Sequence, residues 1–84
     1  MRIVFSDKSA DEISKLDSAI RKRIAEKLLW FSSQENPLSF AKPLSDSRLG
    51  DYRFRVGDYR VIFDVQDGEI LVVKVGHRRE IYVD

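Results

Sequence analysis

The chain has 84 residues, of which 15 are basic and 14 acidic, and a formal net charge of +1. This length fits one compact domain, residues 1–84, and excludes a second one. The small net charge excludes nucleic-acid binding by bulk charge, so a polyanion site must be a local cluster of cations. The absence of cysteine excludes disulfides, thiol catalysis and cysteine-ligated zinc.

The N-terminus lacks the apolar region of a signal peptide, because residues 3–5 are followed at once by polar residues. The longest apolar runs, such as residues 28–31 and 70–73, are far too short to span a membrane. We therefore expect a soluble cytoplasmic protein.

Residues 3–5 predict a short β-strand, and Ser6-Asp7 can cap a following helix. Residues 9–33 contain no Gly or Pro, and their apolar residues recur at helical spacing. This apolar stripe consists of Ile13, Leu16, Ile20, Ile24, Leu28 and Phe31. One unbroken helix of about 25 residues would measure about 37 Å, longer than a domain of this size is wide. A two-helix hairpin is therefore favoured, with Asp17-Ser18 as a second capping point and Ser9 with Glu12 as a possible capping box.

Residues 34–51 are rich in turn formers and contain Pro37, Pro43 and Gly50, which indicates a long connection within the domain. We expect the apolar residues of this connection to hold it against the core. These residues are Leu38, Phe40, Leu44 and Leu49. Trp30 is expected to be buried on the second helix.

Residues 52–63 alternate apolar and cationic side chains on both sides of Gly57-Asp58, which is typical of a β-hairpin with a two-residue turn. In that hairpin Val56 lies opposite Tyr59, and Arg55 lies opposite Arg60. Like charges that face each other across strands destabilise a sheet, and a polyanionic ligand would remove this cost.

Asp67-Gly68 predicts a second hairpin, whose third long strand runs from Glu69 to about Gly76. A two-residue loop would place Lys74 and Arg78 on the apolar face. A three-residue loop would align Leu71, Val73 and Val75 with Val61, Phe63 and Val65, and would bring Lys74 and Arg78 to the arginines. Separating charge from core favours the three-residue loop. The predicted fold is α+β, with a short N-terminal strand and a two-helix hairpin on one face of a small, mostly antiparallel sheet.

The face thus predicted carries Arg53, Arg55, Arg60, Lys74 and Arg78. Guanidinium groups bind phosphate oxygens bidentately and stabilise charge that develops on phosphorus. In RNA cleavage by a metal-free ribonuclease, the substrate's 2′-hydroxyl attacks the adjacent phosphate, and the protein supplies orientation, proton transfer and electrostatics. The sequence shows no metal-ligand spacing and no glycine-rich phosphate loop, so neither a metal nor a cofactor is expected.

Two residues of the C-terminal segment are candidates for proton transfer. His77 titrates near neutral pH, although a lone histidine at a strand end is more often incidental. Tyr82 is either a packing residue or a group that stacks on bases and transfers protons.

The C-terminal half of the chain resembles the RelE family of the RelE/ParE toxin superfamily. The resemblance lies in the run from Tyr52 to Phe63, the following Asp-Gly, and the run Val-Lys-Val-Gly-His-Arg-Arg-Glu-Ile-Tyr that ends at Tyr82. The Lys42-Pro43-Leu44 segment and the two-helix pattern also fit this family. The resemblance implies the toxin of a type II toxin–antitoxin system. Such a toxin enters the ribosomal A site, cuts mRNA without metal, inhibits translation and is neutralised by an antitoxin.

By this resemblance, Arg53 and Arg55 would bind RNA phosphates together with Lys74. Arg60 and Arg78 would hold the scissile phosphate, and Tyr82 would activate the 2′-hydroxyl, with His77 as an alternative. The best-known RelE enzymes carry lysines where this chain has Arg53 and Arg55. Arginine keeps its proton, so proton transfer must come from the C-terminal segment.

Two alternatives stay open at this point: a ParE-like toxin that acts on DNA gyrase without nuclease activity, and a relative that binds RNA without cutting it.

Overall fold

The computed structural model describes residues 1–81 and shows a five-stranded sheet with two helices on one side. The strands are β1 (Ile3–Phe5), β2 (Lys42–Pro43), β3 (Tyr52–Val56), β4 (Tyr59–Gln66) and β5 (Glu69–His77). The helices are α1 (Asp7–Ser14), α2 (Ser18–Ser32), the 3-10 helix η1 (Pro37–Phe40) and α3 (Arg78–Ile81). The sheet order is β1-β5-β4-β3-β2, and only the β1–β5 pair is parallel. The predicted α+β fold is therefore confirmed.

The predicted division into two helices is also confirmed. The Ser6 side chain accepts a hydrogen bond from Ser9 N and caps α1, and the Asp17 side chain accepts one from Ala19 N and caps α2. The suggested capping box of Ser9 and Glu12 is wrong, because both residues lie inside α1 and turn toward β5. No helix within residues 1–81 has the length and apolar character required to cross a membrane.

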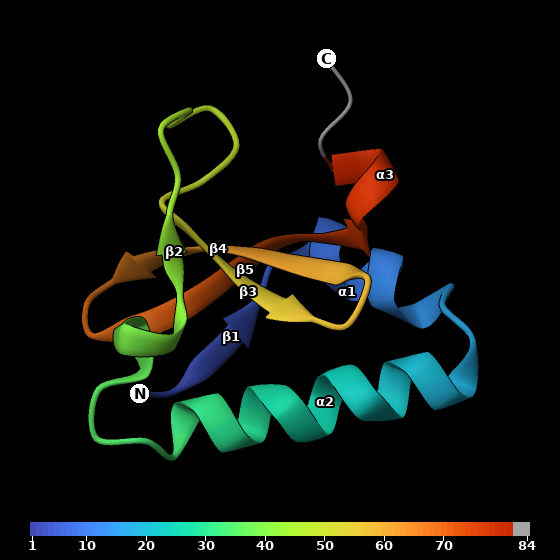
Figure 1. Cartoon of the computed structure of the whole chain (residues 1–84), viewed down its shortest axis with the longest axis horizontal. Helices are drawn as coiled ribbons and strands as arrows, with labels where there is room; N and C mark the ends of the chain where they lie inside the picture. Colours follow the sequence, from blue (N-terminus) through green and yellow to red (C-terminus); the bar gives the residue numbers. More distant parts are fainter. Residues whose placement is uncertain (82–84) are drawn as a thin grey trace.

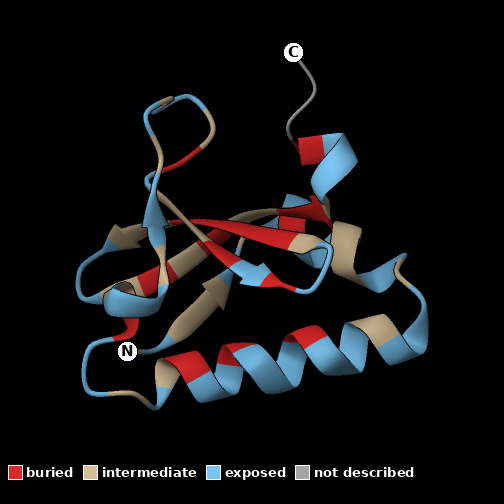
Figure 2. Cartoon of the chain, viewed as in Figure 1, coloured by how far each residue is buried: buried red, intermediate tan, exposed pale blue. Residues whose placement is uncertain are grey.

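The core lies between α2 and the sheet, and Figure 2 shows buried segments, in red, on both α2 and the strands. Ile24, Leu28 and Phe31 of α2 are buried, as the apolar stripe predicts. The Phe31 ring stacks on Phe54 with 4.2 Å between centroids, and Phe54 stacks on Phe63 at 4.4 Å. These aromatic contacts fix the distance between α2 and the centre of the sheet.

Trp30 is not buried as expected; 45% of its surface is exposed. Its ring meets the exposed Phe40 ring edge-on at 4.9 Å, and the Lys27 ammonium lies 5.1 Å from its centroid. Phe40 thus holds the connection to the C-terminal end of α2 at the surface, while Leu38 is only partly buried against the core.

The first hairpin has the predicted geometry. Gly57 and Asp58 form its turn, Val56 pairs with Tyr59, and Arg55 pairs with Arg60. Gly57 has a φ of 59°, a conformation that suits glycine at the first position of a tight hairpin turn.

The second hairpin corrects the predicted register. Its loop has two residues, because Gln66 pairs with Glu69, and both Asp67 and Gly68 have positive φ. Near this loop Phe63 pairs with Val72, so Ile70 and Val72, rather than Leu71 and Val73, face the core.

The register then shifts by one residue. Ile62 pairs with Lys74 and Val61 with Val75, so Val73 is the extra residue of a β-bulge. Beyond the bulge the pairing is the one predicted, and Lys74 lies on the side of the sheet away from α2. The extra residue that directs Lys74 away from the core is therefore Val73 of β5, and not a third residue of the loop.

Side chains of α1 bind the backbone of β5 on both sides of this bulge. Ser9 Oγ donates to Val72 O at 2.8 Å, and Val75 N donates to Glu12 Oε1 at 3.0 Å. β1 pairs with β5 only as far as Val72, whose carbonyl also accepts a hydrogen bond from Ser6 N at 3.0 Å. Glu12 therefore supplies the acceptor that β1 does not offer to the Val75 N–H.

We predict that Glu12→Ala lowers the free energy of unfolding by about 1–3 kcal/mol, because it leaves the Val75 N–H without its acceptor. Urea unfolding monitored by circular dichroism measures this loss. Glu12→Gln is the matched control, since its amide oxygen can still accept the bond. Equal stability of Glu12→Ala and Glu12→Gln would contradict a role of Glu12 in holding the bulge.

Candidate functional site

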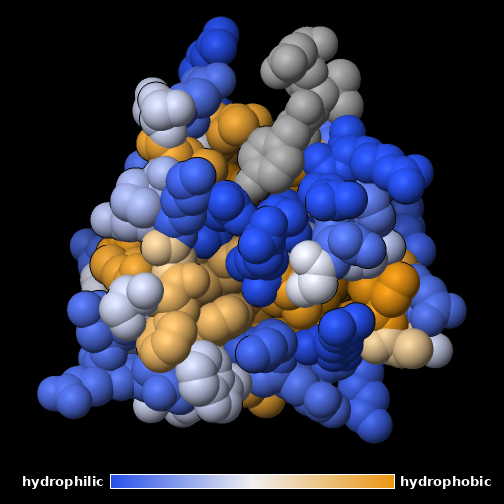
Figure 3. Space-filling view, viewed as in Figure 1, coloured by the Kyte–Doolittle hydropathy of each residue, from blue (hydrophilic) through white to orange (hydrophobic). Residues whose placement is uncertain are grey.

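Cationic side chains gather on the side of the sheet away from α1 and α2. We call this surface the basic face, and it carries Lys42, Arg53, Arg55, Arg60 and Lys74. Each of the three arginines and Lys74 neighbours a buried core residue in its strand, so the alternation of the strands turns it away from the core. In Figure 3 hydrophilic surface covers the region above β3 and around α3.

Two segments border the basic face (Figure 1). The loop of residues 44–51 covers Ile62, and a Cβ on Gly50 would lie only 2.6 Å from Ile62 Cγ2. Asp51 N in this loop donates to Asp64 Oδ1 at 2.8 Å. On the other border α3 places Ile81 against Gly76, where an added Cβ would meet Ile81 Cδ1 at 3.4 Å. Within residues 1–81, these two segments therefore border the basic face on opposite sides.

Arg60 is the most buried cation of the face, with 4% of its surface exposed. Its Nη1 donates to Gly57 O and to Tyr59 O, both at 2.9 Å. These bonds fold the guanidinium back over the turn of the first hairpin. A charge held in this way by backbone carbonyls is pre-oriented before any ligand arrives.

Arg55 is exposed and lies directly across from Arg60. Arg53 is half-buried and pairs with Ile62 of β4. On its other side Ile62 pairs with Lys74 of β5. Within one face, like charges on neighbouring strands repel each other. A phosphodiester bound between them would remove this repulsion and accept charge-assisted hydrogen bonds.

Arg78 does not extend β5 onto the basic face as expected, because it begins α3. Its N donates to Asp58 O at 2.8 Å, and its Nε lies 3.9 Å from Asp58 Oδ1. Arg78 and Arg60 thus both contact the turn of the first hairpin, Arg78 at Asp58 and Arg60 at Gly57 O.

His77 pairs with Tyr59 at the end of β5, and its ring meets the Tyr59 ring at 5.5 Å in an edge-on arrangement. Since Tyr59 faces the helix side of the sheet, His77 is separated from Arg55 and Arg60 by the sheet. Its Nδ1 accepts a hydrogen bond from Arg79 N at 3.2 Å, which holds the first turn of α3. The other candidate for proton transfer, Tyr82, lies outside the described residues.

Arg48, the cation in the loop that borders the basic face, is paired with a carboxylate of the same loop. Arg48 donates from Nε and Nη2 to the Asp46 carboxylate, both at 3.1 Å, and these bonds lower the pKa of Asp46 below its ordinary value. Both groups are charged at neutral pH, so the pair adds no net charge to the border of the basic face. Residues 1–81 contain no group of three or more His, Asp or Glu side chains placed to hold a metal ion.

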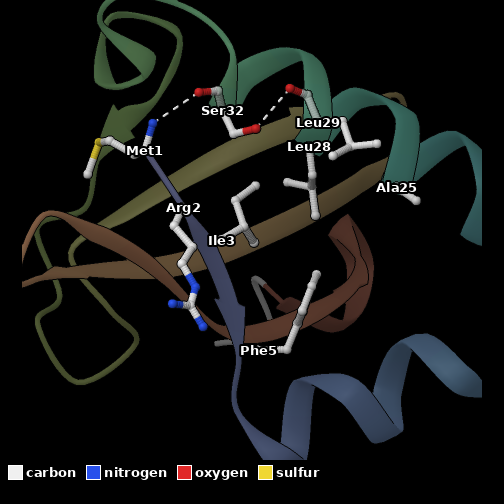
Figure 4. A pocket seen from close by; sticks show the side chains of 8 residues that line it. All are labelled: Met1, Arg2, Ile3, Phe5, Ala25, Leu28, Leu29 and Ser32. Carbon is white, nitrogen blue, oxygen red and sulfur yellow. Dashed lines mark hydrogen bonds between the residues drawn. The ribbon is translucent and has the colours of Figure 1, made fainter.

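A groove of about 490 Å³ lies elsewhere, between β1 and α2 (Figure 4). Phe5 and Leu29 contribute to its apolar walls, and 70% of the Leu29 surface is exposed. Arg2 carries the one charged side chain that lines it, and the Met1 ammonium donates to Ser32 O, so the mainly apolar groove does not suit a polyanion.

Of the basic face, Lys42 was not among the candidates that the sequence suggested. A strand of two residues is too short to show the alternation of apolar and polar side chains that predicts a strand. Lys42 also belongs to a segment whose many turn formers predict a loop. The proline that follows it is a weak signal of an edge strand.

The family model described as the ParE toxin of the type II toxin–antitoxin system parDE matches residues 3–82. The fold is similar to a chain of the toxin–antitoxin complex RelBE2 of Mycobacterium tuberculosis, with 26% identity and a TM-score of 0.78 over 92% of this chain and 96% of that one. A chain of the RelB–RelE antitoxin–toxin complex of Methanococcus jannaschii has 25% identity and a TM-score of 0.73 over 94% of both chains.

A chain of the intact RelBE toxin–antitoxin complex of E. coli shares 21% identity, with a TM-score of 0.68 over 90% of this chain and 94% of that one, and supports the fold alone. A search among curated proteins gave no match.

The hydrogen bonds of Arg60 predict a stability role that Arg55 lacks. We expect Arg60→Ala to lower the free energy of unfolding by about 1–3 kcal/mol, because two carbonyls lose a charged donor. Arg55→Ala removes an exposed side chain and should change stability by less than about 0.5 kcal/mol. Urea unfolding of the two variants measures the difference, and equal losses would show that the Arg60 bonds do not stabilise the hairpin.

Proposed function

The chain belongs to the ParE toxin family of type II toxin–antitoxin systems, within the RelE/ParE superfamily, and from this premise we propose that it is a ribosome-dependent endoribonuclease. It would cut mRNA in the ribosomal A site and so inhibit translation. The observation that carries this proposal is the basic face, where five cations of four neighbouring strands share one side of the sheet. A toxin that acts on a protein target alone has no need of such a face.

In the proposed reaction the 2′-hydroxyl of the substrate attacks the adjacent phosphorus, the bond to the 5′-oxygen breaks, and the products are a 2′,3′-cyclic phosphate and a 5′-hydroxyl. Arg53, Arg55 and Lys74 bind the RNA backbone. Arg60, which is almost fully buried, acts on the charge that builds up on the phosphate oxygens. Its low-dielectric surroundings strengthen this interaction relative to water.

Arg78 is proposed as a second contact to the scissile phosphate, since it meets the hairpin turn that also holds Arg60. For activation of the 2′-hydroxyl we propose Tyr82. His77, the other candidate, faces the helix side of the sheet and caps α3, which favours a structural role for it.

The proposed partners are the ribosome, its mRNA and a cognate antitoxin, and the proposed location is therefore the cytoplasm. The similar chains from M. tuberculosis and M. jannaschii come from toxin–antitoxin complexes, which supports an antitoxin partner here as well.

A second candidate function is inhibition of DNA gyrase without cleavage of RNA. The match to the ParE family model is the observation that favours it. The basic face favours the ribonuclease, because a gyrase inhibitor does not have to bind and cleave a phosphodiester.

We predict that the protein, added to translating ribosomes, produces mRNA 5′ ends that map to the A site. Arg60→Lys keeps the charge but loses the planar fork of donors, so the cleavage rate should fall by about 10²- to 10³-fold. Lys22→Ala is the matched control, because Lys22 is exposed on α2 and away from the basic face. Primer extension on the mRNA measures the cuts, and circular dichroism verifies that both variants are folded.

Intact mRNA with the unsubstituted protein would contradict the proposed ribonuclease. Under that outcome, loss of gyrase supercoiling activity would support the second candidate. Intact mRNA together with active gyrase would exclude both candidates, and binding of RNA by the intact protein would then indicate a relative that binds RNA without cutting it.

A further inference from the structure

Lys42 lies in the two-residue strand β2, directly opposite Arg53. Its neighbour Pro43 pairs with Tyr52, whose ring stacks near the buried Phe63 ring at 5.6 Å on the core side. Because successive side chains of a strand point to opposite faces, Lys42 is directed to the basic face.

The backbone on both sides of Lys42 is fixed. Ala41 N donates to Leu38 O at 3.1 Å, and Leu44 N donates to Asp51 O at 2.9 Å. Ala41 also packs against the core. These contacts hold β2 at the edge of the sheet, so the direction of Lys42 is set by the fold rather than by a free loop.

The Lys42 side chain is exposed, and no carboxylate of residues 1–81 lies within ion-pair distance of it. By contrast, Lys15 is paired with Asp11, and Lys27 lies over the Trp30 ring. The Lys42 backbone lies about 5 Å across the sheet from that of Arg53, so Lys42 adds a second cation beside Arg53 on the basic face.

We propose that Lys42 is a further phosphate-binding residue, which extends the basic face from β3 to the edge strand and binds a backbone phosphate of single-stranded RNA beside the one at Arg53. This inference rests on the proposed function as far as the ligand is RNA. It assigns Lys42 to binding of the strand and not to the chemical step.

The test measures binding of a 2′-O-methylated single-stranded oligoribonucleotide, which cannot react at its 2′-position, by fluorescence anisotropy over a series of salt concentrations. Loss of one phosphate contact should weaken binding and reduce the slope of log affinity against log salt by about 0.7–1. We expect this change for Lys42→Ala. Lys42→Arg should keep the slope, and the control Lys22→Ala on α2 should leave it unchanged.

An unchanged slope and affinity in Lys42→Ala, an equal change in Lys22→Ala, or no binding by the unsubstituted protein would overturn the proposal. The cleavage assay on ribosomes separates this result from the proposed function. If the unsubstituted protein binds the oligonucleotide through Lys42 but leaves mRNA intact, the ribonuclease fails and the phosphate contact stands. If it cuts mRNA and Lys42→Ala binds normally, the contact fails and the ribonuclease stands.

Discussion

The β-bulge at Val73 is the constraint on which the arrangement of the sheet depends. On the loop side of the bulge Val72 faces the core, and on the other side Val75 does, so the one extra residue keeps both in the core and directs Lys74 outward. Without the bulge, the two-residue loop would place Lys74 against α2. Ser9 and Glu12 bind the strand on both sides of this point, so the register of β5 is coupled to the position of α1.

The basic face carries an electrostatic cost that the fold offsets in part. Arg60 is almost fully buried, and its donors are directed to carbonyls of its own hairpin, which compensates for some of its lost hydration. Arg55 and Lys42 are exposed, so water screens their charges until a ligand displaces it. The same residue, Arg60, thus contributes to the stability of the hairpin and to the charge of the site.

Much of this arrangement could be predicted from the residues alone. The alternation around Gly57-Asp58 determines which side chains of β3 and β4 face the core, and Asp17 marks the break between the helices. The loop of the second hairpin could not be predicted in this way. The expectation that charged side chains face away from the core was correct. It requires only one extra residue somewhere in the hairpin, and a bulge supplies that residue as well as a longer loop does.

Trp30, Lys42 and His77 escaped prediction because tertiary contacts position them: Phe40 against Trp30, the short β2 pairing of Lys42, and the Tyr59 partner of His77. The central claim is that the basic face binds RNA, and not the exposed cations of α2, which are Arg21, Lys22, Arg23 and Lys27. A titration of the 15N-labelled protein with 2′-O-methylated single-stranded RNA, followed by amide NMR shifts, tests it most directly. We predict shifts at residues 42, 53–60 and 74 with little change in residues 18–32; shifts confined to residues 18–32 would contradict the claim.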